Sequence, residues 1–454
     1  MAHTQEPPLK LALIAGVGMF LSTLDSGIIN VAIPGLIKAF STDISTVIWT
    51  VTLYTLILSS TIIFWGHLAD KKGRLKIYTI GLILFAISSL LCGASLNIEQ
   101  LIIFRGLQGL SAAMMQATAI AMITTRLQGN DAAKAMGIMG MLLGLGPTLG
   151  PVVGGLILSS IGWRWIFWIN IPICLIGLYG CKQLTKTGEV LHSSRINYVN
   201  LILLSVSLFS ILILLNKMSN NLNYQWILII TAILLLIYFI TEYRSKNRLI
   251  PLSYFKQLKF AAPILGIFAF GGASSVAFIL PPLYFEKIKL FSAWQVGLLC
   301  LAAPVGLVIS ARVVAKFVHQ IGTLKLMMIG ISIMSLALLM LTQMNASWPN
   351  YIILALLLCY GLGGGMFQTP CYINITSQFS RERQAFITAL TRMLQNLSVA
   401  LESAGVALLI SLQTFTQNTS KNLLVGIQHG WWLAGLISLT AAAVLFFNVK
   451  TRQK

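Results

Sequence analysis

Charged side chains inside long apolar stretches are the first candidates for chemistry in this sequence. Asp25 lies in the segment LDSGIINVAIP with no neighbouring base, and Arg105 lies in another apolar stretch, three residues before Gln108. A charge within a membrane-spanning helix is costly, so such residues usually face a polar cavity and pair with one another. We therefore expect Asp25 and Arg105 to form a pair that breaks on protonation and couples proton movement to another process. The alternative is that Asp25 lies near the outer interface, where water hydrogen-bonds its carboxylate.

A second deep carboxylate, Glu402, follows Arg392 by about ten residues in one apolar stretch. It is either a second proton-coupling acid or a structural acid that is hydrogen-bonded. Glu286 ends another stretch, where an interfacial position is the simpler interpretation. The polar residues within or beside the apolar stretches are the candidate substrate ligands: Asn30, Gln108, Glu286, Gln368, Arg392, Gln395 and Asn396.

Composition indicates which elements must hold these residues. Of 454 residues, 57% are hydrophobic and only 9% are charged, whereas soluble domains carry roughly 25% charged residues. A spanning helix needs about 20 mostly apolar residues, and the sequence predicts an all-α polytopic membrane protein. The fourteen predicted spans are 11–37, 46–65, 77–96, 99–123, 134–160, 165–182, 197–216, 225–242, 260–284, 294–316, 323–343, 351–373, 385–413 and 430–448.

The distribution of basic residues predicts the orientation of these spans. With the N-terminus inside, 22 lysines and arginines fall on the inner side and six on the outer side. Inner loops of membrane proteins carry such an excess, so both termini are expected in the cytoplasm. The net charge of +20 is explained by these short loops and by the anionic bilayer surface, and no nucleic-acid partner is expected.

The chain also divides into parts. Polar segments at 183–196 and 243–259 bracket two helices rich in Leu and Ile, and six spans lie on either side. We expect a 6+2+6 arrangement: a six-helix bundle at 1–182, cytoplasmic linkers with two inserted helices at 183–259, and a second six-helix bundle at 260–454. Transporters are commonly built from such repeated halves.

Three further segments have recognisable physical properties. Gly66–Lys76 (GHLADKKGRLK) is a glycine-bounded turn with one acid among four bases, which could also be a simple positive anchor. Gly146–Gly155 (GPTLGPVVGG) has two prolines that kink a helix and four glycines that permit close packing, as in many membrane helices. Trp163–Pro172 (WRWIFWINIP) is typical of an aromatic belt at the outer interface.

Together with LDSGIINVAIP and in this order, these segments resemble the fourteen-spanner drug:proton antiporter subfamily of the major facilitator superfamily. The resemblance covers nearly the whole chain and is looser in the second half, where the family's RxxGG pattern carries the amides Gln395 and Asn396 in place of the glycines. It implies a cytoplasmic gate latch formed by Gly66, Asp70, Gly73 and Arg74. It also implies that the helix packing of Gly146, Pro147, Gly150, Pro151, Gly154 and Gly155 prevents a leak.

The resemblance implies a proton-coupled antiporter in the cytoplasmic (inner) membrane that exports amphipathic small molecules by alternating access. The expected partners are the substrate, protons and the bilayer; the energy source is the proton gradient, without a cofactor, and the sequence does not indicate whether a periplasmic adaptor takes part. The alternatives are a dedicated exporter of an anionic metabolite or siderophore, and a non-transporting membrane sensor. No enzyme is expected, because neither a GxxxxGK[ST] loop nor a metal-spaced His/Cys set occurs.

Overall fold

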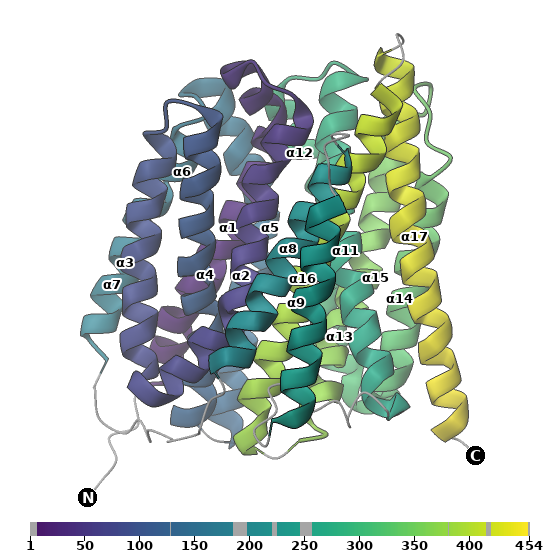
Figure 1. Ribbon diagram of the computed structural model, residues 1–454. Coiled ribbons are helices and arrows are strands. Elements are labelled where there is room, and N and C mark those ends of the chain that lie inside the picture. The colour runs from purple at the N-terminus through teal and green to yellow at the C-terminus, as the bar shows by residue number, and fades with distance from the viewer. Residues whose placement is uncertain are drawn as a thin grey trace, which may run out of the picture.

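The computed structural model describes residues 7–127, 129–184, 198–219, 225–245, 257–379, 381–414 and 419–452, and the regular elements in these ranges are helices (Figure 1). They are α1 (Pro8–Phe40), α2 (Ile44–Lys72), α3 (Arg74–Gly93), α4 (Ile98–Arg126), α5 (Gly129–Ser160), α6 (Trp165–Trp168), α7 (Asn170–Lys182), α8 (Tyr198–Ser219), α9 (Gln225–Arg244), α11 (Leu258–Lys287), α12 (Ala293–Leu299), α13 (Ala302–Ile321), α14 (Thr323–Leu341), α15 (Asn350–Thr376), α16 (Arg381–Thr414) and α17 (Thr419–Arg452).

The predicted all-α class is confirmed by these elements. Within the described ranges, eleven helices are long and apolar enough to cross a membrane. Three shorter apolar helical segments, Leu149–Ser160, Ile202–Ile211 and Trp294–Ser310, coincide with further predicted spans. The total of fourteen spans remains a prediction.

Two of the predicted spans are interrupted. The predicted span 165–182 divides into α6 and α7, and the predicted span 294–316 divides into α12 and α13. A proline follows each break, Pro172 in the first turn of α7 and Pro304 in the first turn of α13. Because proline has no N–H, it cannot bond the carbonyl four residues earlier, so one helical hydrogen bond is missing at each break.

The turn between the second and third spans is shorter than predicted from Gly66–Lys76. The helix α2 continues to Lys72 and α3 begins at Arg74, so Gly73 alone separates them. Gly73 has φ 102°, a backbone conformation that glycine adopts without steric cost. Its N–H donates to the carbonyl oxygen of Ala69 at 2.9 Å. Most of the predicted loop is therefore the last turns of α2, which carry Lys71 and Lys72, whereas Arg74 and Lys76 lie in the first turn of α3.

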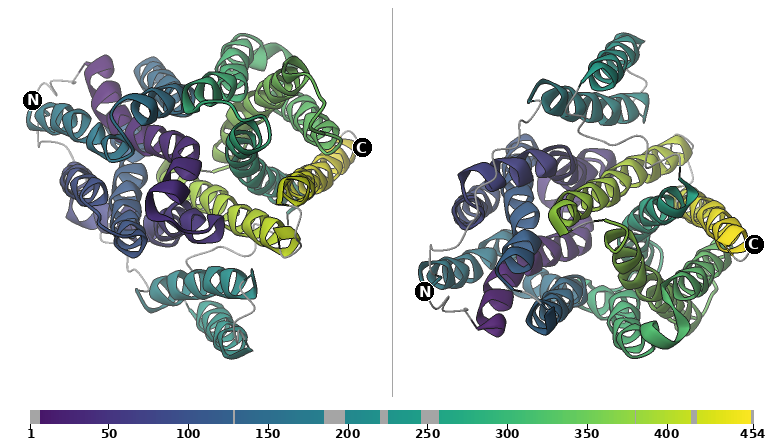
Figure 2. Two further views of the ribbon diagram at one scale, coloured as in Figure 1. Left: turned by 90° about the horizontal axis from the view of Figure 1, so that it is seen from above. Right: turned by 90° about the horizontal axis from the view of Figure 1, so that it is seen from below.

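The helices are arranged in two groups with a pair beside them. Seen along the helix axes, α1–α7 pack together, α11–α17 pack together, and α8 and α9 lie outside both groups (Figure 2). The helix α8 contacts α2 from the first group and α16 from the second, and Ser205 Oγ donates to the carbonyl oxygen of Ser60 at 2.6 Å. The start of α1 and the end of α17 lie at one end of the molecule (Figure 1). We call this the terminal end and the opposite one the distal end.

The glycines of α5 allow it to approach two other helices closely. A Cβ atom on Gly150 would lie 2.7 Å from the Cα of Gly27 in α1, and one on Gly154 would lie 3.3 Å from Ile28. A Cβ on Gly297 of α12 would clash with the carbonyl oxygen of Pro151. The segment Gly146–Gly155 therefore packs α5 against α1 within the first group and against α12 of the second group.

Candidate functional site

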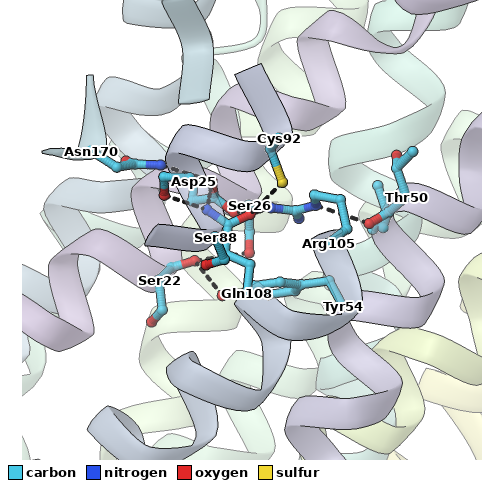
Figure 3. Close-up of polar contacts among 12 residues, drawn as sticks. Ser22, Asp25, Ser26, Thr50, Tyr54, Ser88, Cys92, Arg105, Gln108 and Asn170 are labelled. Atoms are coloured by element: carbon cyan, nitrogen blue, oxygen red, sulfur yellow. Dashed lines mark hydrogen bonds and ion pairs between the residues drawn. The ribbon is translucent and has the colours of Figure 1, made fainter. Parts of the chain in front are cut away.

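Asp25 and Arg105 form an ion pair inside the first group of helices. Asp25 lies on α1 and Arg105 on α4, and their side chains are 2% and 0% exposed. Arg105 Nη1 donates to Asp25 Oδ2 (Figure 3). A buried charge without a partner costs several kcal/mol, so each of these residues stabilises the charge of the other.

Two amide side chains complete the environment of the Asp25 carboxylate. Gln108 Nε2 donates to Asp25 Oδ1 at 3.2 Å, and Asn170 Nδ2 donates to the same oxygen at 3.0 Å (Figure 3). Gln108 lies one helical turn after Arg105 on α4, and Asn170 is the first residue of α7. Both are fully buried. Donors from two helices, α4 and α7, therefore converge on one carboxylate of α1.

Arg105 is held by contacts on its other sides. Its Nε donates to the carbonyl oxygen of Thr50 at 3.0 Å, and its guanidinium carbon lies 4.3 Å from the centroid of the Tyr54 ring. A guanidinium over an aromatic face gains a favourable electrostatic interaction with the ring. The position of Arg105 is therefore fixed by α2 as well as by Asp25.

Gln108 joins this pair to α3. Its Oε1 accepts from Arg105 Nη1 at 2.6 Å, and its Nε2 also donates to Ser89 Oγ at 2.8 Å. The thiol of Cys92 lies 3.7 Å from the same Oε1. Gln108 was predicted as a substrate ligand, and the structure places it in the interior hydrogen-bond network of Asp25 instead of at a free surface.

This arrangement is chemically a switchable charge pair. With Asp25 ionised, the cluster is neutral overall and its carboxylate oxygens have partners. A proton on Asp25 would leave Arg105 with an uncompensated positive charge in a buried site, which the surrounding helices must then accommodate. The cluster can therefore link proton occupancy to helix rearrangement.

Other predicted residues gather at α16. The guanidinium carbon of Arg392 lies 5.2 Å from the centroid of the Tyr372 ring on α15. The Tyr372 hydroxyl donates to Gln395 Oε1 at 2.8 Å. Arg392 Nε and Asn396 Nδ2 are buried donors that have no hydrogen-bond partner among the described residues. Arg392 and Asn396 are four residues apart, so they lie on one face of α16.

Glu402 lies further along α16 and is 3% exposed. Neither of its carboxylate oxygens has a hydrogen-bond partner in the part of the chain that the structure describes. The carboxyl group lies directly against Gly272 of α11, where any Cβ atom would clash with it. The structure therefore does not support the alternative of a hydrogen-bonded structural acid.

The remaining predicted residues are distributed over the molecule. Asn30 on α1 and Gln368 on α15 are half-buried, and Asn30 Oδ1 has no partner within the described ranges. Glu286 lies at the distal end of α11, where Lys38 Nζ is 3.9 Å from its Oε1. The side chain of Asp70 lies outside the described residues, as do the side chains at the start of α16, so the predicted latch is not described.

The residues of these sites that were not predicted from the sequence include Asn170, Tyr54 and Tyr372. Asn170 lies within Trp163–Pro172, which the abundance of tryptophan assigns to an interfacial belt. A buried amide among aromatic residues was the available signal, because an interfacial belt does not require one. Tyr54 and Tyr372 have no distinguishing sequence context.

The chain matches the Major Facilitator Superfamily over residues 15–403, and it belongs to this family. It is 30% identical over 446 residues to the riboflavin transporter RibZ of Clostridioides difficile (strain 630), covering 97% of each chain. It is 27% identical to the multidrug transporter protein MdtP of Bacillus subtilis (strain 168), covering 86% of this chain and 73% of that one. The D-xylose-proton symporter has the same fold, with a TM-score of 0.71, 15% identity and 97% of each chain covered.

The protein is therefore a multi-pass membrane transporter of small molecules, and multidrug transporters are among its relatives. This confirms the superfamily inferred from the sequence motifs. The fourteen-spanner subfamily, the direction of transport and the coupling ion are separate questions.

Proposed function

We propose that the protein is a proton-coupled antiporter that exports amphipathic small molecules by alternating access. The observation that carries this proposal is the buried pair Asp25–Arg105 with its surrounding amides. A purely structural role would not require an ion pair at this depth, because well-packed apolar residues of similar volume are often as stable.

In the proposed cycle, Asp25 takes a proton from outside and releases it to the cytoplasm after the helices rearrange. Proton binding weakens the attraction between Asp25 and Arg105, and the surplus positive charge favours the alternative arrangement of the helices. Glu402 is a second proton site in this proposal, because neither of its buried oxygens has a hydrogen-bond donor among the residues that the structure describes. The gradient is the energy source and no cofactor takes part.

The topology of this proposal is fourteen spans arranged 6+2+6 in the cytoplasmic membrane, with the terminal end in the cytoplasm. The excess of basic residues on that side supports this orientation. Asp70 acts there as a latch that meets the N-terminal end of α16, a contact worth about 0.3–1 kcal/mol when exposed and up to ~2 when partly buried. Asp70→Asn should then shift spin-label distances across the two ends of the molecule.

Reconstituted vesicles test the coupling. Wild-type protein should drive accumulation of ethidium against its gradient when a pH gradient is imposed, and the flux should move protons. Asp25→Asn should abolish this accumulation while ethidium binding persists, and Glu402→Gln should lower the number of protons moved per ethidium. Undiminished proton-driven flux in Asp25→Asn would disprove the assignment.

A second candidate function is transport of one metabolite rather than of many drugs. It is favoured by the match to a riboflavin transporter over 97% of both chains. It is also favoured by the aromatic face of Tyr372 and by Arg392 Nε and Asn396 Nδ2, donors that have no hydrogen-bond partner within the described ranges. Riboflavin fluorescence in the same vesicles separates the two candidates. Riboflavin flux without ethidium flux would favour the dedicated transporter.

A further inference from the structure

We propose that Asn170 is a positioning residue that hydrogen-bonds Asp25 in both of its protonation states. When Asp25 is ionised, Asn170 Nδ2 donates to its carboxylate. When Asp25 is protonated, the Asn170 amide rotates so that Oδ1 takes the place of Nδ2 and accepts from the carboxylic acid. This inference rests on the proposed proton binding at Asp25, and it adds a residue to which neither the sequence motifs nor the family resemblance assigns a role in coupling.

The Asn170 amide has one bond formed and one unused. Its Nδ2 donates to Asp25 Oδ1 at 3.0 Å, while its Oδ1 is buried and has no hydrogen-bond partner among the described residues. An amide side chain carries both donors and an acceptor. Because buried polar atoms without a partner are uncommon, this idle acceptor beside the carboxylate calls for an explanation.

Gln108, the other amide on Asp25, cannot serve in this way. Its Oε1 accepts from Arg105 Nη1 at 2.6 Å, and its Nε2 donates to Ser89 Oγ at 2.8 Å as well as to Asp25. Exchanging the positions of its oxygen and nitrogen would place N–H against the Arg105 guanidinium and break the bond from Arg105 Nη1, which has only donors to offer. Exchanging those of Asn170 breaks only the bond to Asp25 and replaces it with another. Gln108 is therefore fixed, whereas Asn170 is free to turn.

A protonated Asp25 requires an acceptor for its new O–H group. The charged group facing it is Arg105, which offers only donors, and Gln108 presents Nε2. The other titratable groups around Asp25 are Tyr54 from α2, Cys92 from α3 and Cys174 from α7. The phenol of Tyr54 is directed to the carbonyl oxygen of Ser22, at 3.4 Å, and thiols are weak acceptors. Asn170 Oδ1 can accept the O–H with the proton remaining on Asp25.

Asn170 lies at the start of α7, so a rotation of its amide can be accompanied by a change in the α7 backbone. Asn170 begins α7 directly after the break that separates it from α6, and Pro172 follows two residues later. The start of α7 is therefore held by fewer helical hydrogen bonds than a helix interior. Turning of the Asn170 amide takes place where the backbone can adjust.

Infrared difference spectroscopy of the full-length protein in liposomes, stepped through pH, tests this inference without a substrate. The C=O band of protonated Asp25 is identified by its loss in Asp25→Asn. In Asn170→Leu and in the smaller Asn170→Ala, this band should shift to higher wavenumber, because the acid has lost its acceptor. Asn170→Gln keeps the amide and should restore a band near the wild-type position.

Cys181→Ala, at the other end of α7, is the matched control and should leave the band unmoved. The inference is overturned if the acid band stays at its wild-type position in Asn170→Leu and Asn170→Ala. A titration midpoint that shifts while the band does not would also overturn it, because Asn170 would then serve only as a donor to the carboxylate. If Asp25→Asn removes no titrating band, the proposed proton binding at Asp25 fails instead.

Discussion

Lys38 and Glu286 form an ion pair between the two groups of helices at the distal end, with 3.9 Å between Nζ and Oε1. Lys38 lies near the end of α1 and Glu286 near the end of α11. Near the middle of α2, Leu56 is also buried against Ala400 and Ala404 of α16. The two groups are therefore in contact at the distal end, and the ion pair is one of the bonds that must break for this end to open.

The first prediction concerns this contact. Glu286→Lys should replace attraction with repulsion and increase the fraction of molecules open at the distal end. Lys38 is 75% exposed and Glu286 16% exposed, so the pair is worth about 0.2–1 kcal/mol and the shift should be up to roughly fivefold. Spin-label distances across the distal end measure it.

The paired variant Lys38→Glu with Glu286→Lys provides the control. It restores an ion pair of opposite polarity and should return the distances to the wild-type distribution. Distances that stay open in the paired variant would assign the effect to the change at Glu286 alone.

The second prediction concerns the stability that Asp25 and Arg105 each contribute to the folded protein. Arg105→Ala leaves Asp25 buried without its cation, and the loss of an ion-pair partner in such a site costs about 3–5 kcal/mol. Adding Asp25→Asn to Arg105→Ala removes the orphaned charge and should recover part of this loss. Thermal unfolding of the detergent-solubilised protein measures both. Equal melting temperatures for Arg105→Ala and the double variant would show that the charge on Asp25 is not the source of the cost.

The pairing of Asp25 with Arg105 was predictable because both are charged residues in apolar stretches, where few partners are available. The interior role of Gln108 was not, because its position one turn after Arg105 is equally compatible with a free surface. Asn170 was missed for a related reason. Its contact with Asp25 joins residues 145 positions apart, and no local pattern encodes such a distance.

The helices were also predictable only where short stretches of sequence determine them. Helix existence follows from apolar runs, which are local. The length of α2 was underestimated because the segment before Gly73 is polar and charged, and polarity at a membrane surface does not distinguish a loop from the end of a helix. Glycine with φ 102° at position 73 is the feature that ends the helix, and the glycine-bounded pattern placed the turn only approximately.

The third prediction concerns the close packing of α5. Gly150→Ala would place a Cβ atom 2.7 Å from the Cα of Gly27, and the backbones of α1 and α5 would have to separate. Overpacking of this kind costs about 1–3 kcal/mol, so the melting temperature should fall. Gly35→Ala is the matched control on α1, because its Cβ would meet only Leu158 Cδ2 at 3.6 Å. A similar loss in both variants would point to helix flexibility and not to packing.

The fourth prediction concerns pH and the start of α2. Asp43 caps this helix: its carboxylate accepts from the Thr46 N–H at 3.2 Å and from the Thr46 hydroxyl at 2.6 Å. Partial burial alone would raise the pKa of Asp43, but hydrogen bonds from Ser45 and Thr46 outweigh it and lower the pKa below its ordinary value. A lowered pKa in the folded state means that the cap stabilises the protein above the unfolded pKa and is lost as the pH falls through the folded one.

Asp43→Ala should therefore cost about 0.5–2 kcal/mol at neutral pH, and the difference from wild type should shrink as the pH falls below about 4. Asp43→Asn keeps a capping oxygen without the charge, so its loss relative to wild type should be smaller at neutral pH and should also shrink as the wild-type Asp43 is protonated. Melting temperatures over a pH series measure all three proteins. A deficit in Asp43→Ala that is constant with pH would contradict the role of the ionised carboxylate.

The last prediction concerns the charge of the substrate. Asp25 is committed to Arg105, and Glu402 is enclosed against Gly272, so neither acid is available to a dication. Arg392 offers beside the Tyr372 ring an Nε–H that has no partner among the described residues, which suits a planar group with acceptor oxygens. Divalent cationic antiseptics should accordingly be poor substrates.

Arg392→Ala should weaken transport of an anionic carboxylate dye by roughly 10–100-fold, since a hydrogen bond to a charged group is worth about 1.5–3 kcal/mol. Transport of the dye's neutral methyl ester should change much less. Arg392→Lys keeps the charge but not the planar donor geometry, and it should give an intermediate rate. Competition assays in vesicles compare the two dyes. Strong transport of dications, together with equal losses for dye and ester in Arg392→Ala, would show that Arg392 supports the fold of α16 and does not select substrates by charge.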